Sequence, residues 1–311
     1  MTLTQLKYMI AVAEAGNFTI AAEKSFVTQP TLSMQIQKLE DELDLQIFDR
    51  TKKPIEITRV GAMILEQAKH IVDEASRISD IVDQQKGFIG GDFAIGVIPT
   101  VMPTLLPLFL KAFNNKYPKV NLIIKEENTA TIIKNLHEGK LDAAIAATPL
   151  ENDGLVERPL YYEPFVAYLN HNNSLLEKKE LNAEDLDDQN ILLLKDGHCF
   201  RDGILNICGG LKTTNSGFNI ESGSFETLIN LVDEGLGMTL LPYLNTRNLS
   251  DSKKSNIRSF KNPSPAREIS LIYHKNELKL HISEALRDVI SGVIRGEIAF
   301  NDVKIISPLK K

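Results

Sequence analysis

The sequence carries two cysteines, Cys199 and Cys208, and the first of them lies in the polar motif DGHCFRD. A thiolate can attack the O–O bond of a peroxide to give a sulfenic acid, which a second thiol converts to a disulfide. The attacking thiol needs a low pKa, which nearby cations and a helix N-terminus favour. Because Cys199 is flanked by His198 and Arg201, whereas Cys208 follows the more apolar run ILNI, the pattern predicts Cys199 as the attacking thiol and Cys208 as the resolving thiol.

Two other interpretations of the cysteines remain open. Both residues can be buried structural thiols, because a free Cys packs as a small hydrophobic side chain. A zinc site is the weaker alternative, since the spacing C-x8-C differs from the C-x2-C of structural zinc sites and only His198 is nearby. Because the zinc pattern is this weak, we expect no metal site, and we expect no cofactor.

The spacing of the cysteines determines what their oxidation would do to the chain. They are nine positions apart (208 − 199), so a helix between them would separate their Cα atoms by about 13 Å. A disulfide needs roughly 4.4–6.8 Å. Oxidation would therefore unwind or refold this segment, and the new loop of about ten residues would bias a two-state equilibrium by on the order of 2–3 kcal/mol.

Length and composition limit the classes of protein that the chain can belong to. Its 311 residues suffice for two or three folded units, and 43% hydrophobic with 24% charged residues is typical of a globular protein. The net charge of −6 excludes a positive field over the whole molecule, so nucleic-acid binding would depend on a local basic patch. The N-terminus lacks a signal-peptide pattern and the longest apolar segment is broken by prolines, so we expect a cytoplasmic protein without membrane contact.

Residues 1–58 show three short helical patterns followed by two short strands, which together predict a DNA-binding domain. The first pattern includes Leu6 and Ile10, and the second covers residues 18–24. The third begins at a predicted N-cap, Thr28, and buries the stripe Leu32, Ile36, Leu39 and Leu43. The strands enclose a basic tip, as in a wing.

The exposed side of the third helix predicts the contacts with DNA. A helix that presents polar side chains from its N-terminus suits major-groove reading, and basic residues on a wing suit phosphate contacts, which supply affinity rather than specificity. The alternative is an amphipathic core helix with solvated charges. The predicted DNA-binding residues are Thr28, Gln29, Pro30, Thr31, Ser33, Met34, Lys38, Arg50, Lys52 and Lys53.

The remaining chain predicts a linker helix and a second domain. Residues 59–90 carry a long apolar stripe with no partner in its own neighbourhood, so we expect dimerisation through this helix and a glycine-rich hinge after it. Residues 91–300 alternate strand and helix patterns, which predicts a two-lobed α/β domain with mainly parallel sheets and strands that include Phe93–Ile98 and Ile191–Leu194. Residues 301–311 are expected to form a C-terminal tail.

Residues 17–59 resemble the winged helix-turn-helix of LysR-type transcriptional regulators. The segment TQPTLSMQIQKLEDEL follows the family pattern S-Q-P-T-L-S-x-Q-I-x-x-L-E-x-E-L, although Asp44 replaces a C-capping Gly and Ile20 replaces a phosphate-contacting Arg. Asp tolerates the left-handed conformation, so the fold can survive. The resemblance covers essentially the whole chain. It implies an α/β protein with an N-terminal all-α winged helix-turn-helix, a long linker helix and a two-lobed, periplasmic-binding-protein-like effector domain.

The motif DGHCxRD-x5-C resembles the hydrogen-peroxide sensors of this family. That resemblance implies a peroxide pocket lined by hydroxyl groups and an arginine that favours the thiolate. Taken alone, each hydroxyl is also a candidate N-cap, and the arginine a candidate exposed charge at the start of a strand. The residues implied around the thiolate are Thr100, Thr129, His198, Arg201, Asp202, Ser224 and Arg267.

The leading hypothesis is a peroxide-responsive transcriptional activator that is not an enzyme. Its expected partners are hydrogen peroxide, double-stranded promoter DNA, RNA polymerase, a thiol reductant and further copies of itself in a homodimer to homotetramer. An alternative is a LysR-type regulator that responds to a small organic metabolite bound between the lobes. A thiol peroxidase or hydrolase is a third possibility, against which stands the absence of a G-x-S-x-G motif, a metal-ligand cluster and a nucleotide loop.

Overall fold

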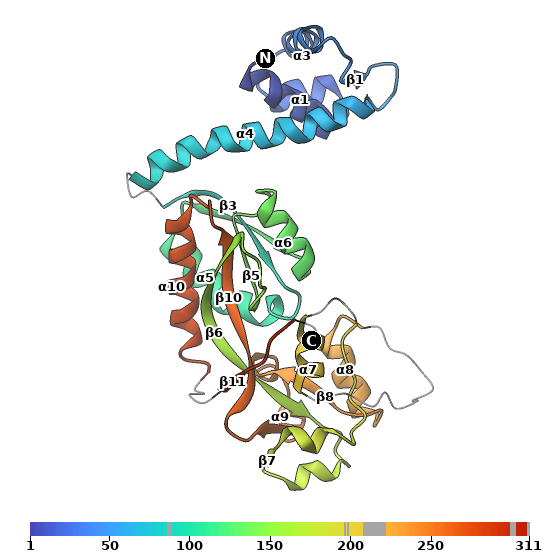
Figure 1. The fold of residues 1–311 in the computed structure, drawn as a ribbon, viewed down its shortest axis with the longest axis vertical. Helices are drawn as coiled ribbons and strands as arrows, with labels where there is room; N and C mark the ends of the chain where they lie inside the picture. Colours follow the sequence, from blue (N-terminus) through green and yellow to red (C-terminus); the bar gives the residue numbers. More distant parts are fainter. Residues whose placement is uncertain (86–88, 196, 198, 208–221, 299–302, 310–311) are drawn as a thin grey trace. The chain divides into compact units, whose positions relative to one another are not determined.

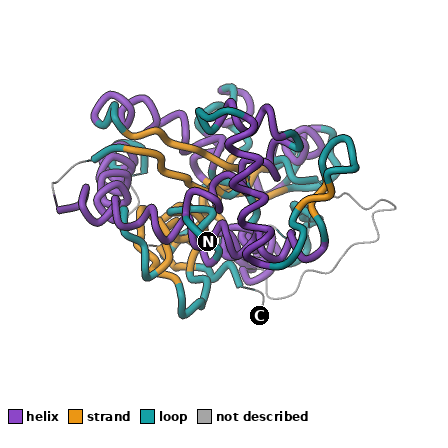
Figure 2. Tube along the Cα trace, turned by 90° about the horizontal axis from the view of Figure 1, so that it is seen from above, coloured by secondary structure: helices purple, strands orange, loops and turns teal. Residues whose placement is uncertain are grey.

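The computed structural model describes residues 1–85, 89–195, 197, 199–207, 222–298 and 303–309. The chain forms two compact units, residues 1–88 and residues 89–311 (Figure 1). The second unit contains both helices and strands, which Figure 2 distinguishes by colour.

The first unit is a helical domain with a small β-ribbon. Its three short helices confirm the predicted ones, and the third begins after Thr28, whose hydroxyl accepts a hydrogen bond from the Thr31 N–H. Asp44 closes that helix in the left-handed conformation at φ 52°, as the sequence predicted. The elements are α1 Leu3–Ala15, α2 Phe18–Lys24, α3 Gln29–Leu43, β1 Phe48–Asp49, β2 Glu56–Ile57 and α4 Arg59–Gln85.

The core of the first unit contains a carboxylate that ties α3 to the ribbon. Leu32, Ile36 and Leu39 are fully buried, as predicted, and Glu40 beside them is also buried. One Glu40 oxygen accepts hydrogen bonds from the Ile47 and Phe48 N–H groups at 2.8 and 3.1 Å. Glu40 belongs to a charged run of the sequence, but its buried carboxylate holds α3 and the ribbon together.

The linker helix α4 differs from the prediction in one respect. Its apolar stripe was expected to have no partner nearby, but Ala68 is buried and Ile64, Ile71 and Val72 pack against the core of the first unit. The reason is that α1 lies against the first half of α4. Exposed apolar side chains remain on α4 at Met63, Ile78 and Val82.

The second unit consists of two lobes that share two long strands. Lobe I contains β3, β4, β5, α5, α6 and α10, lobe II contains β7, β8, β9, α7, α8 and α9, and β6 and β10 run from one lobe to the other (Figure 1). The elements are β3 Gly91–Val97, α5 Met102–Lys116, β4 Val120–Glu126, α6 Thr129–His137, β5 Ala143–Thr148, β6 Leu155–Tyr168, β7 Glu180–Leu181, α7 Cys199–Ile207, α8 Phe225–Asp233, β8 Thr239–Pro242, α9 Asp251–Lys254, β9 Ile257–Phe260, β10 Ser264–His274, α10 Leu280–Ile294 and β11 Val303–Ile305, with 3-10 helices at Ser174–Glu177, Ala183–Leu186 and Tyr243–Thr246.

The sheet is mixed, so the prediction of mainly parallel strands was wrong. Its order is β4-β3-β5-β10-β6-β9-β7, with β11 beside β10 and β8 beside β6. The strand β10 runs antiparallel to both β5 and β6, and β6 runs antiparallel to β8 and β9. The physical reason is that the two crossing strands traverse the lobes in opposite directions.

Two further predictions about lobe II need correction. Residues 191–194 do not form a strand, and only Ile191 makes an isolated bridge, to Met238. Residues 303–305 were expected in a tail but form β11, parallel to Ser264–Ala266. The Asn206 side chain on α7 donates hydrogen bonds to the carbonyls of Ser307 and Leu309, at 3.0 and 2.8 Å. The end of the chain is therefore attached to the helix that Cys199 begins.

Candidate redox site and DNA-binding surface

Cys199 is the first residue of α7 and contacts lobe I. The thiol is free, partly buried, and packs against the lobe I core, whereas its neighbour Phe200 is buried in the core of lobe II. A cavity of about 10 Å³ beside it is lined by Ile98, Pro99, Thr100, Asn128, Thr129, Gly197 and Cys199. That volume is close to what a single water molecule needs.

The hydroxyl group that hydrogen-bonds to the Cys199 thiol belongs to Thr129, the first residue of α6. Asn128 provides the N-cap of this helix, accepting from the Thr131 N–H, which leaves the Thr129 hydroxyl available to hydrogen-bond to Cys199. Of the hydroxyl residues implied by the family resemblance, the structure thus brings Thr100 and Thr129 to the cavity. Ser224 is exposed and precedes α8 without a side-chain cap hydrogen bond.

Arg267 is buried, so its interpretation as an exposed charge at the start of a strand was wrong. It lies within β10 and is only 3% exposed. Its guanidinium donates to the Thr100 hydroxyl at 2.9 Å and to the Thr100 carbonyl at 3.0 Å. The Nε and Nη2 groups donate to one Glu163 oxygen at 2.9 and 2.7 Å. The two charges face each other across the β6–β10 pairing.

The aromatic ring of Phe200 connects this ion pair to α7. The Arg267 guanidinium carbon lies 5.2 Å from the centre of that ring, within the range of a cation–π interaction. The Phe165 and Phe225 rings also contact Phe200, at 5.0 and 4.9 Å between ring centres. The residue after Cys199 is therefore held by both the lobe II core and the buried arginine.

The pKa of the Cys199 thiol is raised in this conformation. Burial is the main cause, and the charge of Arg267, the Thr129 hydroxyl and the Phe200 N–H lower the pKa in part, whereas Asp202 raises it. The expectation of a low thiol pKa was therefore wrong for this state, because desolvation outweighs the nearby cation. The charge of Arg267 and the Thr129 hydroxyl nevertheless keep the pKa of the Cys199 thiol lower than burial alone would make it.

Of the other residues predicted at the redox site, Arg201 and Asp202 lie on α7. Arg201 donates a hydrogen bond to the Leu194 carbonyl at 3.1 Å, and Asp202 is on the next position of α7. His198 and Cys208 lie outside the described residues. Sequence reasoning missed Glu163, for which the signal was an acidic residue inside the apolar run YYEPFVAYL.

The predicted DNA contacts lie on the exposed parts of α3 and of the ribbon. The side chains of Thr28, Gln29, Thr31, Met34 and Lys38 are exposed. Lys52 and Lys53, at the tip between β1 and β2, are exposed as well.

Arg50 is engaged within the domain rather than standing alone in solvent. Its guanidinium lies 2.8 Å from a Glu40 oxygen and over the Phe18 ring at 5.1 Å, and it donates to the Ser33 hydroxyl at 3.4 Å. Its side chain remains 38% exposed. Arg50 therefore stiffens the wing and retains some surface for a phosphate.

Comparison with known protein families decides the class of this chain. The family described as bacterial regulatory helix-turn-helix protein, lysR family, matches residues 3–62, and the LysR substrate binding domain matches residues 86–294. The chain belongs to the LysR family. It is accordingly a DNA-binding transcription regulator.

Similar proteins include several that are named OxyR. This LysR-family regulator is 34% identical to the DNA-binding transcriptional dual regulator OxyR of Escherichia coli over 95% of this chain and 97% of that protein. Full-length OxyR of Pseudomonas aeruginosa, with a Cys-to-Asp substitution, is 32% identical with a TM-score of 0.73, over 94% of this chain and 98% of that chain. A peroxide-bound Cys-to-Ser mutant of Corynebacterium glutamicum OxyR is 28% identical with a TM-score of 0.64, over 95% of this chain and 93% of that chain.

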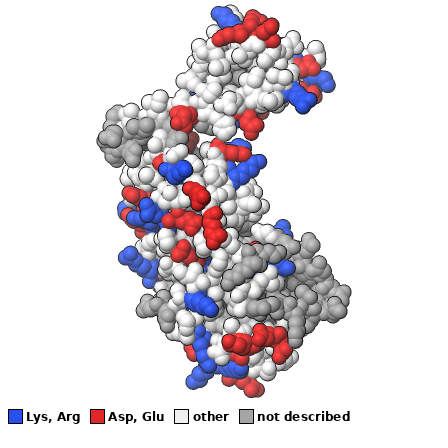
Figure 3. Space-filling model, in the orientation of Figure 1, with Lys and Arg blue, Asp and Glu red and all other residues white. Residues whose placement is uncertain are grey.

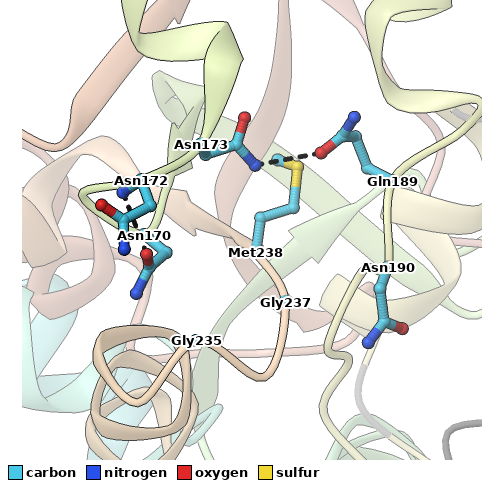
Figure 4. Close-up of a pocket in the computed structure, with 8 residues that line it drawn as sticks. All are labelled: Asn170, Asn172, Asn173, Gln189, Asn190, Gly235, Gly237 and Met238. Atoms are coloured by element: carbon cyan, nitrogen blue, oxygen red, sulfur yellow. Dashed lines mark hydrogen bonds between the residues drawn. The ribbon is translucent and has the colours of Figure 1, made fainter.

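A larger cavity in lobe II of the regulator is lined by amides. Its volume is about 230 Å³, and Figure 4 shows its residues, Asn170, Asn172, Asn173, Gln189, Asn190, Gly235, Gly237 and Met238. Most of these amides hold the surrounding loops: Asn170 donates to two carbonyls at the end of α8, Asn190 donates to the Leu236 carbonyl, and Asn173 donates to Gln189. All eight residues belong to lobe II, so this cavity is not a site between the lobes.

The surface of the regulator carries both basic and acidic side chains. On the face in Figure 3, small groups of Asp and Glu side chains lie among separate groups of Lys and Arg side chains. None of the helices in the described ranges is long and apolar enough to span a membrane. Within the same ranges, no group of three or more His, Cys, Asp or Glu side chains is placed to hold a metal ion.

Proposed function

We propose that this LysR-family regulator senses hydrogen peroxide through Cys199 and changes its contacts with promoter DNA in response. The observation that carries the proposal is the Cys199 thiol beside a cavity of about 10 Å³, with Thr129, Thr100 and the buried Arg267 around it. Two relatives, named a hydrogen peroxide-inducible genes activator and the dual regulator OxyR, support the same conclusion.

The size of the cavity favours peroxide over an organic metabolite. Sites for small organic ligands usually occupy roughly 300–1,000 Å³, whereas the cavity at Cys199 holds about 10 Å³. Hydrogen peroxide has two heavy atoms and needs only a slight widening of this space. A metabolite at the same place would have to separate α7 from α6 and would break the Thr129 contact with Cys199.

The chemical step transfers one oxygen atom to the sulfur. The Cys199 thiolate attacks one peroxide oxygen, the O–O bond breaks, and the leaving hydroxide takes up the thiol proton, giving Cys199 sulfenic acid and water. Thr129 and Arg267 support the developing thiolate, because both lower the pKa of Cys199 against the effect of burial. Thr100, held by Arg267 at the cavity wall, orients the peroxide.

The second step closes a disulfide and releases a second water. The Cys208 thiol attacks the sulfenic sulfur, and the hydroxyl group leaves with the thiol proton. The segment from Cys199 to Ile207 is helical, and its eight residue steps separate the Cα atoms of Cys199 and Ile207 by about 12 Å. Disulfide formation therefore requires α7 to unwind, which releases Arg201 from the Leu194 carbonyl and Asn206 from the end of the chain.

The DNA-binding unit supplies the output of the switch. We assign major-groove contacts to the exposed residues at the start of α3, and phosphate contacts to Lys52 and Lys53 and in part to Arg50. The exposed apolar residues of α4 are suited to pair with a second copy. The proposal includes a homodimer to homotetramer in the cytoplasm, activation through RNA polymerase, and resetting by a thiol reductant.

Titration of the purified protein with peroxide tests the proposal. One equivalent should consume both thiols, whereas Cys199→Ser should leave Cys208 unreacted and the DNA footprint unchanged by peroxide. Regulation by peroxide that survives in Cys199→Ser would contradict the proposal and point to a metabolite-responsive regulator. Sustained peroxide consumption with a cheap reductant would instead point to a thiol peroxidase.

A further inference from the structure

One aromatic side chain of the DNA-binding unit has no role in its core. Phe26 lies in the turn between α2 and α3 and is 96% exposed. A side chain in that position contributes almost nothing to the hydrophobic stabilisation of the fold. Unlike Phe18 and Phe48, whose rings meet at 6.0 Å in the core, Phe26 has no ring contact among those identified in this unit.

The backbone at Phe26 is in a conformation that a bulky residue rarely adopts. Its φ is 55°, in the left-handed region just after the end of α2. The Phe26 N–H donates to the Glu23 carbonyl and the following Val27 N–H to the Ala22 carbonyl, so the turn is a regular helix end. Gly or Asn is usual at this position, and Phe there is a steric outlier. Strained residues that make no internal contact are characteristic of functional surfaces.

The position of Phe26 indicates what it contacts. It is two residues before Thr28, the N-cap of α3, and the N-terminal residues of a recognition helix are those that enter the major groove. The exposed residues that follow Phe26 at the start of α3, Thr28, Gln29 and Thr31, are all uncharged, so a base edge suits this side better than a phosphate. The apolar group that DNA offers in the major groove is the thymine C5-methyl, which side chains such as Phe contact.

We propose that Phe26 is a sequence-determining DNA contact that recognises the methyl group of a thymine next to the bases read by α3. This inference extends the DNA-binding role of the family and does not depend on the peroxide chemistry. In the free protein the left-handed backbone at Phe26 is strained. The contact between the Phe26 ring and DNA would offset the energetic cost of that strain in the complex.

The test compares Phe26→Asn with wild-type protein, both full-length, on a duplex selected from a random library by the wild-type protein. Asn tolerates the left-handed conformation, so the melting temperature should not fall. Affinity for the selected duplex should fall about five- to tenfold. The slope of log affinity against log salt should not change, because no charge is lost. Leu3→Ala, which truncates another exposed apolar side chain of the same unit, is the matched control and should bind normally.

Replacing individual thymines of the duplex with deoxyuracil identifies the contact. At one position, loss of the methyl group should weaken binding of the wild-type protein about fivefold and leave binding of Phe26→Asn unchanged. Equal sensitivity of both proteins at every thymine would overturn the proposal. Unchanged DNA affinity with lost transcription activation would also overturn it and assign Phe26 to a protein partner, and a lowered melting temperature with uniformly weaker binding would assign it to the fold.

Discussion

Replacement of Arg267 by Met separates the structural role of the buried ion pair from its effect on Cys199. The substitution leaves the Glu163 carboxylate, 1% exposed, without its cation and removes two donors from Thr100. Removing one partner of a buried pair costs about 3–5 kcal/mol. For a unit of this size we expect the melting temperature of the effector domain to fall by roughly 6–20 °C.

The double variant Arg267→Met/Glu163→Gln should recover part of that stability. Glutamine is neutral, and its carbonyl can still accept from the Leu244 N–H, which bonds to Glu163 at 3.0 Å. The remaining loss should be about 1–3 kcal/mol, from the unpaired Thr100 oxygens. Reaction of Cys199 with peroxide should not recover, because Arg267 lowers the pKa of this thiol and its charge is still absent.

Calorimetry and stopped-flow thiol oxidation at pH 7 measure the two effects on the same samples. Glu163→Gln alone is the matched control, since it keeps the arginine and should oxidise at least as fast as the wild type. The reasoning is refuted if the double variant regains the wild-type oxidation rate, or if Arg267→Met costs less than about 1 kcal/mol.

Three further predictions concern other parts of the chain. Thr129→Val should shift the pH profile of Cys199 alkylation to higher pH, because the lost hydroxyl lowers the pKa of the thiol; an unchanged profile would exclude that contact. Glu40→Gln should destabilise the DNA-binding unit by about 1.5–3 kcal/mol in urea unfolding, since the carboxylate that holds Arg50 becomes neutral while the ribbon keeps its acceptor. Burial raises the pKa of Glu277 from 4.5 to about 6, so the unfolded chain releases this proton first and stability falls as pH rises from about 4.5 to 6. Glu277→Gln should therefore match the wild type at pH 4 and exceed its stability at pH 8 by at most about 2 kcal/mol, and equal gains at both pH values would contradict this.

The local structure of the DNA-binding unit could be predicted because its signals are local. The spacing of Leu32, Ile36 and Leu39 defines a buried helix face, and Thr28 and Asp44 mark the ends of that helix. The same reasoning could not find the internal role of Glu40, because its partners are backbone N–H groups seven and eight residues away.

The effector domain was less predictable because its main features join distant segments. Apolar runs indicate strands but not their directions, so the antiparallel pairing of β10 with β5 and β6 was missed. The burial of Arg267 depends on Glu163, 104 residues away in the sequence. The thiol pKa was predicted from sequence neighbours alone, whereas burial between the lobes is the larger cause.

Trapping the first oxidation product in Cys208→Ser tests the central claim most directly. Without the resolving thiol, one equivalent of peroxide in the presence of a sulfenic-acid-specific trapping reagent should label Cys199, as detected by peptide mass spectrometry. Arg267→Met in the same background should slow the labelling. Absence of label on Cys199, with peroxide left unconsumed, would contradict the account.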